Sequence, residues 1–208
     1  MDTQPDIYTY NFNGVSGKFY IDNTMKPVEI EPTGIKITLN SSFFDSSDPN
    51  GSPKFIITDL NGIQYFFGGI NAVETSFNRK IAVGYQEPPS VEVENSWYLT
   101  KIFNPVTSDV INFTYDSSLA TYFSGNEQNL DYTYSSSFLI SGKLTNYKYR
   151  TTSKESLLRE ITSKVGRMVF TYVKRFPEDN FPFSKLSEIN YYDLSSNLIK
   201  KVQFDYTT

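Results

Sequence analysis

A short pattern recurs three times along this chain. It reads Leu-x-(Lys or Glu)-Ile, then a polar turn, then Phe-x-Tyr, and it spans residues 99–115, 158–172 and 186–206. A looser copy occupies residues 55–67, where Leu60-Asn61-Gly62 separates two apolar runs. Recurrence on this scale indicates supersecondary units that cannot bury an apolar face alone and therefore stack on one another. Two apolar runs joined by a polar turn predict a β-hairpin for each unit.

The rest of the sequence favours the same fold class. The 208 residues include 17 Phe and 16 Tyr, residue types that favour strands. Apolar and polar residues alternate in residues 8–13 and 35–40, as expected for strands with one buried face. We therefore predict an all-β fold with a mostly antiparallel sheet of stacked hairpins. An open superhelical or shell-like sheet is one form that such a stack can take. Strand content should far exceed the usual quarter of residues, with little helix.

Alternation within the repeats predicts which side chains form the core. Ile111, Phe113 and Tyr115 share one face of a strand, while Asn112 and Thr114 lie on the other. Equivalent positions in the three units should be largely buried, with the first Leu of each unit on the hairpin partner. These residues are Phe113, Tyr115, Phe170, Tyr172, Phe204, Tyr206, Leu99, Leu158 and Leu186.

Domain organisation and two local alternatives follow from irregular stretches. Residues 71–95 have the weakest pattern and include a Pro-Pro pair near their end. We therefore divide the chain into an N-terminal β-sheet region, 1–95, and a repeat-bearing β region, 96–208, with one continuous domain as the alternative. Residues 117–123 could form a turn or two of helix. The Thr152-x-x-Glu155 pattern resembles a helix capping box, but the repeat register favours a strand over 157–162.

Composition removes several kinds of chemistry. The chain has no Cys and no His, which excludes disulfides, thiolate nucleophiles, imidazole bases and the usual zinc and haem ligands. Its 19 basic residues are scattered in a chain of net charge −4, which disfavours nucleic acid and anionic membranes as partners. No apolar run reaches the roughly 18 residues of a spanning helix. Strand-like sequence continues to the last residues, so we expect a piece of a longer chain.

The repeat unit resembles a known family. Residues 97–116, with Phe113-Thr114-Tyr115-Asp116 at their end, are similar to the Tyr-Asp (YD) repeat of RHS/teneurin-type proteins, and in particular to the region preceding the repeats in large surface proteins of Bacteroidetes. The resemblance extends over 157–206 and, more loosely, 55–67. It implies an extracellular or cell-surface β superhelix or shell that can enclose a passenger domain. The chain departs from the family pattern in having Gly166-Arg167-Met168 in place of Gly-Arg-Leu, and in uneven spacing of its units.

Candidate sites are few, and each has a structural alternative. An aromatic platform for sugar rings or a partner protein could form from Trp97, Tyr98, Tyr122, Tyr132 and Tyr134, although aromatic residues in β proteins more often pack in cores or cross-strand pairs. Asp45, Asp48 and Asn50 could ligate calcium but lack the spacing of a calcium loop.

Two acidic residues could imitate the carboxylate pair of a glycosidase. Glu92 and Glu94 share a strand face, and Asp109 or Asp116 could complete the pair. Solvated carboxylates at a strand edge are commoner. The prediction is a non-catalytic structural or encapsulating module without metal or cofactor, whose partner is the remainder of its parent chain. The alternative is a glycan- or protein-binding module.

Overall fold

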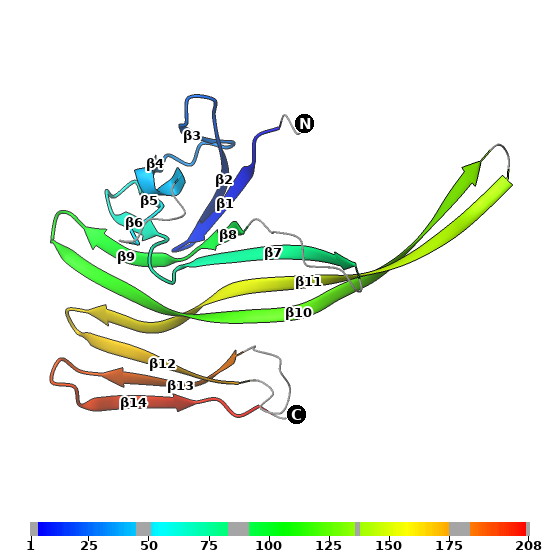
Figure 1. Cartoon of the computed structure of the whole chain (residues 1–208). Coiled ribbons are helices and arrows are strands. Elements are labelled where there is room, and N and C mark those ends of the chain that lie inside the picture. The colour runs from blue at the N-terminus through cyan, green and yellow to red at the C-terminus, as the bar shows by residue number, and fades with distance from the viewer. Residues whose placement is uncertain (1–3, 45–50, 83–91, 136–137, 175–183, 207–208) are drawn as a thin grey trace.

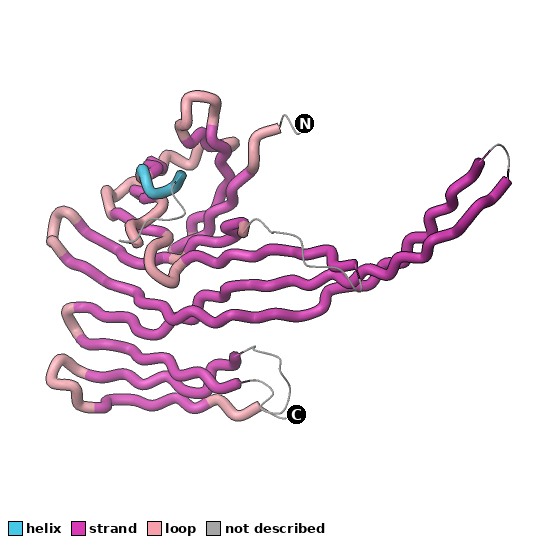
Figure 2. Tube along the Cα trace, viewed as in Figure 1, coloured by secondary structure: helices cyan, strands magenta, loops and turns pink. Residues whose placement is uncertain are grey.

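The computed structural model describes residues 4–44, 51–82, 92–135, 138–174 and 184–206, and within them the fold is all-β and mostly antiparallel, as predicted (Figures 1 and 2). Its elements are β1 (Ile7–Phe12), β2 (Val15–Ile21), β3 (Pro27–Glu29), β4 (Lys36–Leu39), a 3-10 turn (Ser41–Phe44), β5 (Phe55–Thr58), β6 (Gln64–Phe67), β7 (Val73–Ala82), β8 (Val93–Trp97), β9 (Leu99–Asn104), β10 (Asp109–Ser135), β11 (Phe138–Ser163), β12 (Gly166–Lys174), β13 (Ser184–Tyr192) and β14 (Leu198–Gln203).

The strands form two sheets. The smaller sheet has the order β1-β2-β3. The larger one runs β14-β13-β12-β11-β10-β9-β6-β5-β4, with β7 paired to β11 and β8 paired to β7. Figure 1 shows the small sheet lying over the β4–β6 end, while β12 to β14 extend the other end. Because β6 pairs directly with β9, the large sheet continues without a break past residue 95, where the sequence suggested a soft boundary.

Each repeat unit is one antiparallel hairpin. The three units form β9–β10, the 157–163 end of β11 with β12, and β13–β14, and the looser copy forms β5–β6. The last strand of each unit pairs with the first strand of the next, through the pairs β6–β9, β10–β11 and β12–β13. The preference for strand over helix at 157–162 is therefore confirmed.

A β-bulge recurs at the second position of each Leu-x-(Lys or Glu)-Ile motif. The register skips Thr100 where β9 meets β6, Arg159 where β11 meets β10, and Ser187 where β13 meets β12. The terminal Tyr hydroxyl of each unit donates a hydrogen bond to the carbonyl oxygen of that unit's first Leu. The three bonds are Tyr115 to Leu99 (2.8 Å), Tyr172 to Leu158 (3.0 Å) and Tyr206 to Leu186 (2.7 Å). The repeated Leu and Tyr thus mark the two ends of one hydrogen bond beside a bulge.

Removing one of these hydroxyls should lower the free energy of unfolding, and the loss should be larger where the Tyr is more buried. Tyr115→Phe is expected to lower the free energy of unfolding by about 0.5 to 1.5 kcal/mol, the usual net worth of such a bond. Tyr206→Phe should cost less, because Tyr206 is 49% exposed and water can replace its hydroxyl. Urea unfolding of both variants checks this order, and equal losses would contradict it.

Two stretches differ from the local alternatives read in the sequence. Residues 117–123 are not helical but belong to β10, because the strand continues in register with β11 through this segment. Residues 71–95, the weakest in pattern, contain β7 and β8. β7 pairs with β11 from Thr75 to Ala82. Beyond that pairing, β10 and β11 continue as a two-stranded ribbon that projects from the body (Figure 1).

The core lies between the two sheets, and its buried side chains come from the looser copy at 55–67 and the small sheet, not from the three repeat units. They belong to β1, β2, β5 and β6 and are Tyr10, Phe12, Phe19, Phe55, Ile57, Tyr65 and Phe67. The prediction that the repeat aromatics are largely buried is wrong. Phe113, Tyr115, Phe170 and Tyr172 are only half-buried, as are Leu99, Leu158 and Leu186, while Phe204 and Tyr206 are 37% and 49% exposed.

The physical reason is that the repeat strands form a single layer. Tyr65 lies under Phe12 of the small sheet, with ring centroids 4.6 Å apart, and is the cross-strand neighbour of Ile102. The same face continues through Ile111 and Phe113 to the strands of the later units. In the described residues, the small sheet covers this face only at its β5–β6–β9 end.

The opposite face of the repeat region is polar and contains ion pairs. Arg167 lies 3.1 Å from Glu160, and Lys201 pairs with Glu188. This face therefore suits water. The apolar face beyond the small sheet is the surface that lacks a covering layer in the described part of the chain.

Candidate functional site

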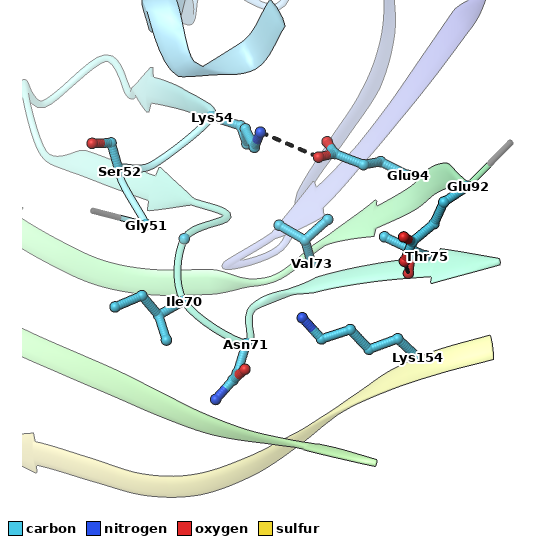
Figure 3. A pocket seen from close by; sticks show the side chains of 11 residues that line it. Gly51, Ser52, Lys54, Ile70, Asn71, Val73, Thr75, Glu92, Glu94 and Lys154 are labelled. Atoms are coloured by element: carbon cyan, nitrogen blue, oxygen red, sulfur yellow. Dashed lines mark hydrogen bonds and ion pairs between the residues drawn. The ribbon is translucent and has the colours of Figure 1, made fainter. Parts of the chain in front are cut away.

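A polar cavity of about 370 Å³ lies where β5, β7, β8 and β11 converge (Figure 3). Lys54 reaches it from the start of β5, and its side chain is only 7% exposed. A buried ammonium group requires a counter-charge. Glu94 of β8 provides it, at 3.2 Å from the Lys54 nitrogen, and also accepts a hydrogen bond from Trp97 Nε1 at 2.9 Å.

The remaining polar groups of this cavity are of mixed charge. Glu92 accepts a hydrogen bond from the Thr75 hydroxyl, and Asn71 donates to the Tyr115 carbonyl at 3.3 Å. Lys154 extends from β11 toward the same space (Figure 3). Two ammonium groups thus face two carboxylates, a balanced lining that holds the strands together and offers donors and acceptors to a small polar molecule.

The acidic residues proposed as a glycosidase pair fall into two groups. Glu92 and Glu94 line this cavity together. Asp109 instead bonds to Lys164 at 2.7 Å, and Asp116 pairs with Arg159 at 3.7 Å, both on the repeat strands. The structure therefore does not bring Asp109 or Asp116 to Glu92 and Glu94.

A second cavity, of about 310 Å³, lies beside the first, between β7, β8, β10 and β11, and contains Tyr122. Burial and the negative charge of Glu74 raise the pKa of Glu155 in its lining above the ordinary value. Glu74 accepts a hydrogen bond from the Tyr98 hydroxyl at 2.9 Å. Burial, that hydrogen bond and the charges of Glu74 and Glu155 raise the pKa of Tyr98 to about 12.

The burial of Glu155 and its repulsion by Glu74 predict a pH-dependent stability change. Because the folded-state pKa of Glu155 is raised, ionised Glu155 costs stability at neutral pH, and the cost disappears below the ordinary glutamate pKa of about 4.3. Glu155→Gln should therefore raise the free energy of unfolding at pH 7 and leave it nearly unchanged at pH 3.5, in urea titrations at both values.

Glu127→Gln is the matched control with the opposite sign. The hydrogen bonds from Lys80 and Tyr149 lower the pKa of Glu127, so its ionised form stabilises the fold. This variant should be less stable than the parent at pH 7. Stabilisation by Glu127→Gln, or destabilisation by Glu155→Gln, would contradict the assignment.

The third cavity, larger than the other two, is an aromatic groove of about 1040 Å³ between β1 and the β8–β9 segment. Trp97 and Tyr98 line it together with Tyr8 and Tyr115. The Trp97 ring packs on Tyr8 and Phe43, with centroids 5.8 and 5.9 Å apart.

The five predicted aromatic residues do not form one platform. Trp97 and Tyr98 share the groove, Tyr122 lies in the second cavity, and Tyr132 is exposed on the projecting ribbon. The side chain of Tyr134 lies outside the described residues. Sequence reasoning missed Tyr8 and Tyr115 as groove residues, although both belong to strands that it predicted.

The described segments also bear on metal-ligand clusters and on membrane-spanning helices. The proposed calcium ligands Asp45, Asp48 and Asn50 fall outside the described segments. Inside them, three or more Asp or Glu side chains nowhere gather as a metal site would require. The part of the chain that the structure describes also contains no helix of the length and apolarity needed to span a membrane.

Comparison of the chain with protein-family models, with curated proteins and with solved structures found no match.

Proposed function

We propose that the chain is a non-catalytic structural module of a large secreted or cell-surface protein of the YD-repeat kind, in which its hairpins contribute to an encapsulating sheet. One observation carries this proposal: all three units repeat the same hairpin, the same bulge and the same Tyr-to-Leu hydrogen bond. Each unit also pairs with the next in the same way, so the arrangement can be extended by further units.

The outer edge of β14 supports the same role. Within the described residues β14 pairs only with β13, and the apolar side chains of Val202 in this strand and of Phe204 just after it are exposed. Every earlier Phe-x-Tyr strand pairs with a Leu-x-(Lys or Glu)-Ile strand. The β14 edge therefore suits another strand of that type, and the uncovered apolar face suits the interior of a larger assembly.

Adding one unit tests the stacking part of this proposal. A second copy of residues 175–206 is fused after residue 206, and thermal unfolding is followed by circular dichroism. Each kcal/mol of new interface should raise the midpoint by about 2 to 4 °C for a chain of this size. The control fusion carries lysine in place of the Leu and Ile of the added motif. Equal midpoints for the parent and both fusions would contradict stacking.

The proposed surface location can be tested in the cells that naturally produce this protein. An antibody against this chain should label intact cells or the medium, and brief protease treatment of intact cells should remove the signal. Protection of the chain until the cells are lysed would contradict a surface role.

Binding at the aromatic groove is the second candidate function. The grouping of Trp97 and Tyr98 in a groove of ligand size favours it. Trp97 is the only tryptophan of the chain, so its fluorescence reports on this site alone. Saturable changes on titration with oligosaccharides or peptides would support a binding role.

A further inference from the structure

The aromatic groove follows one free strand edge. Residues 6–13, which contain β1, form one wall of the groove, and no residue of β2 or β3 lines it. Since β2 pairs with one edge of β1, the groove lies along the other edge. Within the described residues, β1 has no partner strand on that side. A free edge presents backbone N–H and C=O groups that can pair with another extended chain.

The polar atoms of three groove aromatics are already used inside the protein. Trp97 Nε1 donates to Glu94, the Tyr98 hydroxyl to Glu74, and the Tyr115 hydroxyl to the Leu99 carbonyl. These rings therefore supply apolar contact but few free hydrogen-bonding groups, and a sugar needs both. Some polar side chains also line the groove, but the free edge of β1 offers a continuous row of backbone N–H and C=O groups, which favours a polypeptide ligand over a glycan.

The groove also continues an existing interface. Tyr8, Tyr10 and Phe12 of β1 pack inward against the large sheet, and the groove floor prolongs that contact through Leu99 and Tyr115. A fourth strand beside β1 would thus extend the small sheet over the same apolar face. Two carboxylates line the groove. The Asp6 carboxylate, at one end, has no ion pair among the described residues, whereas the Glu94 carboxylate is neutralised by Lys54.

We propose that this groove binds an extended polypeptide segment by strand addition to β1, with alternate apolar side chains on the aromatic floor and a basic residue beside Asp6. The inference rests on the second candidate function, binding at the groove, and not on the structural role of the repeats.

The test uses Trp97 fluorescence and an acetylated, amidated eight-residue peptide that begins with lysine and then alternates valine with threonine. The parent peptide should bind saturably. Two isomers are compared, one N-methylated on every odd and one on every even residue. Because only alternate amides of an added strand face β1, one isomer should lose roughly tenfold or more in affinity and the other should bind like the parent.

Two matched variants locate the site. Ser96 lines the groove, whereas Ser16 is an exposed residue of β2 outside it. Ser96→Phe should weaken peptide binding roughly tenfold or more by filling the groove, and Ser16→Phe should bind like the parent. Both variants must first show the parent's circular dichroism spectrum and melting curve.

The outcomes separate the two ideas. Equal affinity of both methylated isomers and the parent peptide would overturn strand addition while leaving binding at the groove intact. Saturable binding of cello- or chito-oligosaccharides without peptide binding would also overturn it, in favour of a glycan site. If neither peptide nor oligosaccharide changes Trp97 fluorescence, the binding function itself fails.

Discussion

Replacing Phe19 with alanine should lower the free energy of unfolding by about 3 to 5 kcal/mol. Phe19 is 1% exposed, and its ring stacks on Tyr8 at 5.1 Å and meets Phe55 edge-on at 6.3 Å. It joins the small sheet to the large one, so its removal leaves a cavity between them. Urea unfolding followed by circular dichroism measures the loss.

Phe204→Ala is the matched control for this experiment. Phe204 belongs to the third repeat unit but is 37% exposed, so less apolar surface returns to water, and the expected loss is about 1 kcal/mol. If Phe204→Ala costs as much as Phe19→Ala, the repeat sheet has a buried core of its own.

Gly166→Ala should cost about 1 to 3 kcal/mol from backbone conformation alone, with a further cost from a clash. Gly166 begins β12 after the two-residue turn of the second unit, at φ +148°, a conformation suited to glycine. A Cβ there would lie 2.3 Å from the Tyr192 carbonyl oxygen of β13. The strands would have to separate, so thermal unfolding should begin at a lower temperature.

Gly62→Ala measures the cost of the left-handed backbone conformation without a Cβ clash. Gly62 has φ +80° in the turn between β5 and β6, but a Cβ there would meet no atom within 4 Å. This variant should lose only about 1 kcal/mol, the cost of the left-handed conformation. Equal losses of unfolding free energy at both glycines would mean that the close β12–β13 contact at Gly166 adds nothing to the cost of Gly166→Ala.

The sequence was sufficient to predict the hairpins because their signals are local. Alternating apolar residues and a polar turn lie within about 20 residues, as in Leu99 to Tyr115, and the structure confirms each unit. The bulge was not predictable, because the residues skipped, Thr100, Arg159 and Ser187, are not of one side-chain type: two carry hydroxyls and the third a guanidinium group. What they share is a neighbouring Leu carbonyl that a Tyr hydroxyl on another strand reaches.

Burial was mispredicted for a different reason. Alternation shows that Phe113 and Phe170 lie on an apolar face, but not whether another layer covers that face. The covering layer, β1 to β3, reaches only the strands around Tyr65 and Ile102. How far a covering sheet extends depends on tertiary packing between segments distant in the sequence, which no short pattern encodes.

The same limit applies to the candidate site. Trp97 and Tyr98 were identified from residue type, and both line the groove. Its other wall is β1, some 85 residues earlier in the chain, so the groove forms only when the two sheets pack. Tyr122 and Tyr132 are aromatic too, but they lie further along β10, beyond the part of that strand that lines the groove.

Amide hydrogen exchange tests the central claim most directly, namely that the repeat hairpins form one continuous sheet with the N-terminal strands. We expect residues 167–169 of β12 and 188–192 of β13, which pair with a strand on both sides, to be protected to nearly the same degree as β5 and β6, while alternate amides on the outer edge of β14 exchange rapidly. Rapid exchange throughout β12 to β14, with protection confined to β1 to β6, would contradict a continuous sheet.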